Sequence, residues 1–257
     1  MMECVQGHAG CLPAPKGYIK AAMSLCKKYN ALFVCDEIQT GFGRTGSLMA
    51  YQKEGIKPDL VMLGKALSGG MMPIGMVLGN RETIGQLGPG EYETLPLDDV
   101  TGSLGESVGF IILYDFLADP NPLNCRNNST FGGNPLACAV ASEAVNIVLD
   151  ENLSERSAVL GQRLFERLSK IKYPHTTIKA TGRGLFCALY LDESHPSGRV
   201  TAARLCALMR QRGVLTISAS NRIRVAPPLT ISEEDLWHAV DVVDLSIRDL
   251  VDVDVIA

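Results

Sequence analysis

The stretch LFVCDEIQTGFGRTG, residues 32–46, is followed along the chain by PDLVMLGKALSGG, residues 58–70. Each contains a short apolar run that is typical of a buried parallel strand, and each run ends in polar residues and glycines. Asp36 follows the first run and Lys65 follows the second. In α/β sheets, ligands bind at the carboxyl ends of the strands. The two runs therefore predict an α/β sheet with Asp36 and Lys65 at its ligand-binding edge.

A lysine and an aspartate at two strand ends can hold one charged, nitrogen-containing ring from two sides. Pyridoxal phosphate chemistry needs this pair. The lysine amine forms a Schiff base with the aldehyde, and the aspartate keeps the ring nitrogen protonated so that the ring accepts electrons. The lysine must also lose a proton readily, which burial beside the cofactor would favour. Taken singly, however, Lys65 reads as a solvated loop residue and Asp36 as part of an exposed turn.

The composition indicates an ordinary globular protein. The chain has 257 residues, of which 46% are hydrophobic and 20% charged, enough for one large domain or two smaller ones. The net charge is −4 and no basic block stands out, which argues against nucleic-acid binding. No apolar stretch is long enough to span a bilayer.

Cysteine and histidine usage argues against a metal site. The eight cysteines form no CxxC pair, and the chain has only four histidines. We expect most of these cysteines to be small buried residues of a reduced intracellular protein. No targeting signal is readable at the start. The expected compartment is the cytoplasm, with the mitochondrion open if an N-terminal signal is missing.

Helices and apolar strands alternate along the first part of the chain, which is typical of an α/β sheet with crossovers. Asn134 and Pro135 are suited to the cap and the first position of a long apolar helix over 134–149. The pattern predicts further helices over 15–30, 153–171, 200–212 and 232–250. It predicts strands at 31–37, 60–65, 74–79, 176–180, 182–191, 214–217 and 222–225.

The pattern divides the chain into two domains. Residues 1–150 are expected to form part of a large domain, a mostly parallel sheet with flanking helices. Residues 151–257 are expected to form a smaller α+β domain. Residues 92–128 have loop composition around the apolar run VGFIILYDFL and fit neither. A short helix or strand around 108–117 is one alternative for this segment, and disorder is the other.

Four motifs resemble a known family. They are CDEIQTGFGRTG (35–46), PDLVMLGKALSGG (58–70), STFGGNPLAC (129–138) and RVAPPLTISEEDL (224–236). Together they resemble the fold-type I, class III aminotransferases, and within them the ornithine aminotransferases. The resemblance implies pyridoxal 5′-phosphate as cofactor, and an amino donor and a 2-oxo acid as substrates. It also implies a homodimer in the complete form.

The resemblance also implies roles at matching positions. Lys65 would be the Schiff-base lysine and Asp36 the partner of the ring nitrogen. Ile38 would pack on one ring face, and Gln39 would bond to the phenolic oxygen. Thr130 would donate to the phosphate across the dimer interface. Substrate-binding positions follow in the same way: Arg224 would bind the α-carboxylate, Glu3 matches an active-site glutamate, and His8 lies where ornithine aminotransferases have a second one.

Three departures from the family pattern bear on activity. The chain begins near the middle of the family's large domain, and residues 92–128 interrupt a junction that is nearly direct in the family. His8 cannot neutralise Arg224 as a carboxylate would, so amino donors other than ornithine are also possible. The leading function is transfer of the ω-amino group of ornithine to 2-oxoglutarate, giving glutamate semialdehyde and glutamate. A catalytically inactive fragment, or an enzyme for 4-aminobutyrate or N-acetylornithine, remains as the alternative.

Overall fold

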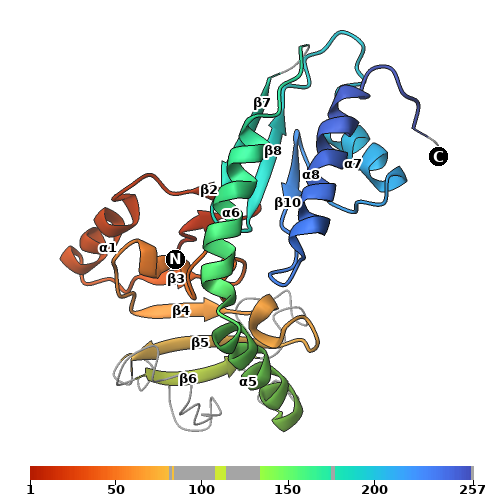
Figure 1. The fold of residues 1–257 in the computed structure, drawn as a ribbon. Helices are drawn as coiled ribbons and strands as arrows, with labels where there is room; N and C mark the ends of the chain where they lie inside the picture. Colours follow the sequence, from red (N-terminus) through yellow and green to blue (C-terminus); the bar gives the residue numbers. More distant parts are fainter. Residues whose placement is uncertain (81–82, 84–107, 114–133, 175–176, 256–257) are drawn as a thin grey trace, which may run out of the picture. The chain divides into compact units, whose positions relative to one another are not determined.

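The computed structural model describes residues 1–80, 83, 108–113, 134–174 and 177–255 (Figure 1). Contacts divide the chain into two units. The first comprises residues 1–4, 15–43 and 47–153, and the second comprises residues 5–14, 44–46 and 154–257. The sequence analysis places all of residues 1–150 in one domain. The contacts instead assign the short early segments 5–14 and 44–46 to the second unit, because they bond to strands and turns far along the chain.

The sheet of the first unit has the strand order β3-β4-β5-β6. Its strands are β3 (Val34–Asp36), β4 (Leu60–Leu63), β5 (Gly75–Asn80) and β6 (Val108–Leu113). β3 and β4 are parallel, but β4–β5 and β5–β6 are antiparallel. The short connection over 64–74 cannot hold the crossover that a parallel pair requires. The expectation of a mostly parallel sheet is therefore wrong for the described strands. Of the alternatives left open around 108–117, the structure has the strand, β6.

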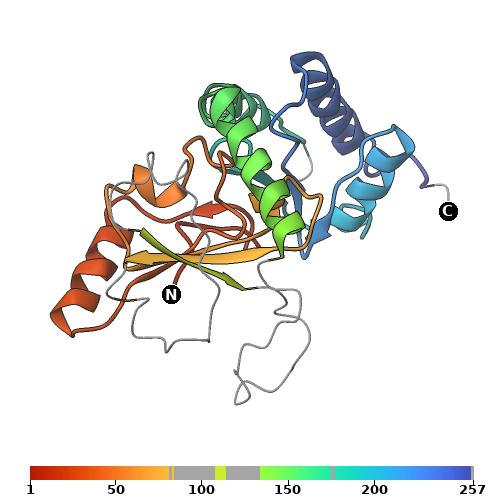
Figure 2. The same ribbon diagram turned by 90° about the horizontal axis from the view of Figure 1, so that it is seen from below.

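Helices flank this sheet. They are α1 (Tyr18–Lys28), α2 (Ala50–Lys53), the 3₁₀ helix η1 (Lys65–Ser68) and α5 (Pro135–Asp150). The predicted start of α5 is confirmed, since the Asn134 side chain accepts a hydrogen bond from the Ala137 amide at 2.9 Å. α5 lies against η1 and the sheet (Figure 2). The core between them consists of Phe42, Met49, Val61, Leu63, Leu67, Met76, Leu78, Ala141 and Val145.

The second unit contains an antiparallel sheet of order β7-β8-β10-β9. Its strands are β7 (Ile178–Gly182), β8 (Cys187–Leu191), β9 (Ser218–Ala219) and β10 (Arg222–Val225). The strand predicted at 214–217 is displaced to β9. The displacement follows from a tight turn at Ser220 and Asn221, which sets Ala219 opposite Arg222. The other predicted strands of this unit lie close to their expected positions.

Three helices cover one face of this second sheet (Figure 1). They are α6 (Leu153–Ser169), α7 (Ala202–Gln211) and α8 (Glu233–Arg248). Alternate residues of β8 point into the core beneath them, together with Ile223 of β10. Fully buried members of this core include Leu164, Leu168, Leu185, Leu189, Leu191, Leu205, Leu208, Met209 and Ile223.

A short hairpin covers the opposite face of the same sheet. It consists of β1 (Val5–Gln6) and β2 (Leu12–Pro13). Val5 and Cys11 form a buried cluster with Phe186 and Ala188. The turn of the hairpin is also held by hydrogen bonds: the Tyr190 hydroxyl donates to the Ala9 carbonyl at 2.6 Å. These contacts explain why residues 5–14 belong to the second unit.

The backbone of α6 lies very close to the backbone at Gly184, in the turn before β8. A Cβ on Gly161 would lie 2.1 Å from the carbonyl carbon of Gly184, so only glycine fits there. One turn earlier, Ser157 accepts from the Leu185 amide and donates to the Arg44 carbonyl, both at 3.1 Å. These contacts bring residues 44–46 into the second unit.

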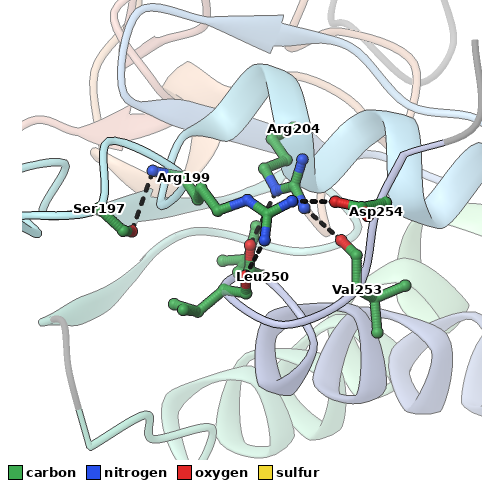
Figure 3. Close-up of polar contacts among 7 residues, drawn as sticks. Ser197, Arg199, Arg204, Leu250, Val253 and Asp254 are labelled. Carbon is green, nitrogen blue, oxygen red and sulfur yellow. Dashed lines mark hydrogen bonds and ion pairs between the residues drawn. The ribbon is translucent and has the colours of Figure 1, made fainter.

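Two arginines hold the chain where α8 ends (Figure 3). Arg199 donates to the Val251 carbonyl at 2.6 Å, and Arg204 donates to the Leu250 carbonyl at 2.8 Å. α8 ends at Arg248, so these two carbonyls lie just beyond the helix, where the guanidinium groups satisfy them. Further bonds reach Val253 and Asp254 from the same guanidinium groups. This explains the fixed path of the segment that follows α8.

The cysteines Cys4, Cys11, Cys35 and Cys187 are buried. Burial raises the pKa of Cys187 to about 12. A hydrogen bond with Cys4, followed by burial, raises the pKa of Cys35. Reactive thiols require a lowered pKa, so Cys35 and Cys187 are suited to the core and not to nucleophilic chemistry.

No helix within the described ranges combines the length and apolar character needed to cross a membrane.

Candidate functional site

Asp36 is the last residue of β3, and Lys65 lies just after β4, the parallel neighbour of β3. In the β3–β4 register Asp36 lies opposite Met62, and the next amide, that of Glu37, donates to the Met62 carbonyl at 2.9 Å. Lys65 begins η1, with Gly64 alone between it and the end of β4. The prediction that the two residues stand at adjoining carboxyl ends of one sheet is confirmed.

The backbone at Lys65 is unusual. Its φ of 48° lies in the left-handed region, which residues other than glycine rarely adopt and which is found preferentially at functional sites. The side chain is exposed and has no hydrogen bond or ion pair with any described residue. The burial that the sequence analysis expects for Lys65 is burial beside bound cofactor, and it stays a prediction. Its neighbours Gly64, Gly69 and Gly70 have no side chains that could cover it.

Asp36 presents one free carboxylate oxygen. Its Oδ1 atom accepts from the Ile38 amide at 3.0 Å, and its other oxygen has no partner among the described residues. Ile38 lies beside the residue that precedes Lys65, because a Cβ on Gly64 would be 3.6 Å from Ile38 Cγ2. Gln39 is partly buried, and the described residues provide no partner for its amide. A free amine, a free carboxylate oxygen and an apolar side chain thus belong to adjoining strand ends.

The sequence analysis missed the role of Glu37. Its side chain is only 1% exposed. Oε1 accepts from the Tyr51 amide at 2.8 Å, and Oε2 accepts from the Ala50 amide at 3.0 Å and from the Thr40 hydroxyl. Burial, with the nearby Glu37 charge, raises the pKa of Tyr51 to about 12. The only sequence signal was an acidic residue at the end of an apolar run, which equally fits an exposed turn.

Arg224 and His8 belong to the second unit. The guanidinium group of Arg224 lies 5.6 Å from the Phe186 ring centroid and donates to the Gly7 carbonyl at 3.2 Å. His8 follows Gly7 and is exposed. Arg222 shares the strand face and lies over the Tyr190 ring at 5.5 Å. Within the described chain neither arginine pairs with a carboxylate, so the structure does not support a structural ion pair as the role of Arg224.

The remaining predicted residues divide as follows. Glu3 lies in the first unit, next to Met2, which forms a parallel bridge with Cys35 of β3. Thr130 lies outside the described residues, as does most of 92–128. Asp36, Ile38, Gln39 and Lys65 are gathered within the first unit, and Arg224 and His8 within the second.

Comparison with known proteins decides the family. The family model described as "Aminotransferase class-III" matches residues 1–247. The chain belongs to the class III aminotransferases. The enzymes of this family depend on pyridoxal phosphate.

Several relatives of this class III aminotransferase are named as ornithine or acetylornithine aminotransferases. The chain is 39% identical to the ornithine aminotransferase of Schizosaccharomyces pombe over 99% of its own length and 50% of that protein. The solved ornithine aminotransferase of Plasmodium yoelii has a TM-score of 0.78 at 31% identity, over 97% of this chain and 56% of that one. The acetylornithine aminotransferase of Elizabethkingia anophelis has a TM-score of 0.75 at 37% identity, over 95% and 55%. These neighbours confirm the fold class, and the chain spans about half the length of each.

The residues of the first unit fit pyridoxal phosphate in their chemistry. Lys65 offers an amine that no described residue engages, and Asp36 offers an unengaged carboxylate oxygen. Ile38 supplies an apolar surface next to the Lys65 turn. A cationic ring nitrogen and an aldehyde are the groups that such a carboxylate and such an amine accept.

Proposed function

We propose that the complete protein is a pyridoxal-phosphate-dependent transaminase that transfers the ω-amino group of ornithine to a 2-oxo acid. The observation that carries the proposal is the pair of unengaged groups, Lys65 and Asp36, at adjoining strand ends in a chain of this family. With 2-oxoglutarate as acceptor the products are glutamate semialdehyde and glutamate. We also propose that the protein is located in the cytoplasm, with the mitochondrion as the alternative, and that it forms a homodimer.

Each residue is assigned one task. When bound, pyridoxal phosphate supplies an aldehyde and an electron-accepting ring. The Lys65 amine would hold it covalently and would move the proton at the carbon that carries the transferred amino group. The Asp36 carboxylate holds the proton on the ring nitrogen. Ile38 packs on one ring face, and Gln39 bonds to the phenolic oxygen.

The remaining tasks concern phosphate and substrate. We assign the phosphate to Thr130, across a dimer interface. We assign the substrate α-carboxylate to Arg224, because a planar guanidinium group can bind a carboxylate through two parallel hydrogen bonds. The absence of a carboxylate partner for Arg224 among the described residues supports this assignment. Glu3 is assigned to the substrate pocket.

Two alternatives to an ornithine transaminase are each favoured by a specific observation. The Lys65 side chain is exposed and not enclosed by a pocket of described residues, which favours a catalytically inactive chain as the first alternative. His8 in place of a glutamate, together with the similarity to an acetylornithine aminotransferase, favours another donor such as N-acetylornithine or 4-aminobutyrate. Screening amino donors, with release of glutamate as the readout, separates the donors from one another.

Titration of the chain with pyridoxal phosphate tests the proposal. We expect a visible absorbance band that saturates with cofactor and that Lys65→Ala abolishes. Lys57→Ala, which removes an exposed lysine of the same unit, should leave the band unchanged. No saturable band in the unaltered chain, or an equal band in Lys65→Ala, would show that this chain does not assemble the site.

A further inference from the structure

Glu37 is a buried acid to which the proposed reaction assigns no task. Burying a carboxylate is costly unless hydrogen bonds replace its water. Glu37 receives two backbone N–H groups, from Ala50 and Tyr51, and the Thr40 hydroxyl. Donors of this kind favour the charged form and hold it in one geometry. The side chain therefore fixes the turn after β3 to the start of α2.

The backbone at this point is held from both sides. The Asp36 amide donates to the Met2 carbonyl at 2.9 Å, and the Glu37 amide donates to the Met62 carbonyl, also at 2.9 Å. Consecutive side chains of an extended segment point to opposite sides. Glu37 is buried, whereas Asp36 and Ile38 are only partly buried. Asp36 is the last residue of β3, so fixing Glu37 on one side directs Asp36 to the other, and Ile38 begins the turn that the Asp36 carboxylate holds.

Asp36 and Ile38 are thereby directed towards the part of the sheet edge where Lys65 lies. Ile38 lies within van der Waals distance of the position that a Cβ on Gly64 would take, next to Lys65. Asp36 Oδ1 accepts the Ile38 amide, so the two side chains are oriented together. We propose that Glu37 is a positioning residue: its buried carboxylate fixes Asp36 and Ile38 on the side of the sheet edge where Lys65 begins η1. The consequence for the cofactor rests on the function proposed above.

Amide hydrogen exchange of the whole chain tests this inference without cofactor. In Glu37→Gln an NH2 group replaces one of the two carboxylate oxygens and faces an N–H donor, so the bonds to that oxygen and the negative charge are lost. We expect exchange at Ala50, Tyr51 and Ile38 to become faster by about tenfold or more, with β4 and β5 unchanged. Glu143→Gln, on an exposed position of α5, should change nothing. Unaltered exchange at Ile38 in Glu37→Gln would overturn the inference.

A spectroscopic readout separates positioning from mere stability. If the unaltered chain binds pyridoxal phosphate, Glu37→Gln should weaken binding by about tenfold and change the pH dependence of the visible band, because Asp36 is no longer held at the ring nitrogen. Faster exchange with unchanged affinity and pH profile would reduce Glu37 to a structural residue and overturn the inference. If the unaltered chain shows no band, the proposed function fails for this chain, and exchange at Ile38 alone decides the role of Glu37.

A second variant covers the case in which Glu37→Gln does not fold. Thr40→Val removes one donor to Glu37 Oε2 and keeps the shape of the side chain. We expect a smaller increase in exchange, confined to the same amides. No increase at Ile38 in Thr40→Val would then overturn the inference.

Discussion

Gly161→Ala is expected to destabilise the second unit by at least about 3 kcal/mol, at the upper end of what overpacking costs. In a free helix the same change would stabilise by about 1 kcal/mol. Here the added carbon would lie 2.1 Å from the Gly184 carbonyl carbon and 2.3 Å from its oxygen. Both are backbone atoms, so no side chain can turn away. Gly184 cannot retreat either, because a Cβ placed on it would be 2.5 Å from the Thr45 carbonyl carbon.

Chemical denaturation measures this effect. The chain has one tryptophan, Trp237 of α8, whose ring contacts Arg163 and Arg167 of α6 at 5.0 and 5.3 Å, so its fluorescence reports on the α6–α8 packing. Val159→Ala, at an exposed position of α6, is the matched control and should change the free energy of unfolding by less than about 0.5 kcal/mol. Equal stability of Gly161→Ala and the unaltered chain would contradict the close approach of α6 to Gly184.

Asp36→Asn is expected to weaken the binding of pyridoxal phosphate by roughly tenfold to a hundredfold. A hydrogen bond to a charged group contributes about 1.5–3 kcal/mol, and about 1.4 kcal/mol corresponds to a factor of ten. Asparagine retains an oxygen that can accept the Ile38 amide, so the local turn is preserved while the charge is lost. The loss of affinity therefore reports on the charge at the ring nitrogen and not on the fold.

The dissociation constant from the visible band measures this second effect. Asp150→Asn, which removes an exposed carboxylate at the end of α5, is the control and should bind the cofactor as the unaltered chain does. Equal affinities for Asp36→Asn and the control would mean that Asp36 does not contact the cofactor.

Local signals predicted the parts of the fold that depend on nearby residues. The start of α5 followed from Asn134 and Pro135, whose capping chemistry involves only the first helical turn. The adjoining ends of β3 and β4 followed from two apolar runs and the usual crossover between them. The family motifs then assigned roles to Asp36 and Lys65 that periodicity alone could not supply.

Distant contacts account for what the sequence did not reveal. The hairpin over 5–14 belongs to the second unit because Tyr190 and Thr181 bond to its carbonyls, and no local pattern indicates such partners. The antiparallel β5 depends on the length of one connection and not on the apolar run itself. Glu37 resembled an exposed turn residue because its donors, the Ala50 and Tyr51 amides, lie beyond the glycine-rich loop.

Borohydride reduction of the chain with bound pyridoxal phosphate, followed by peptide mapping, tests the central claim most directly. Reduction makes the cofactor–lysine bond permanent, so the modified peptide identifies the lysine. The site described here predicts that the label is found on Lys65. A label spread over other lysines, with Lys65 unmodified, would contradict it.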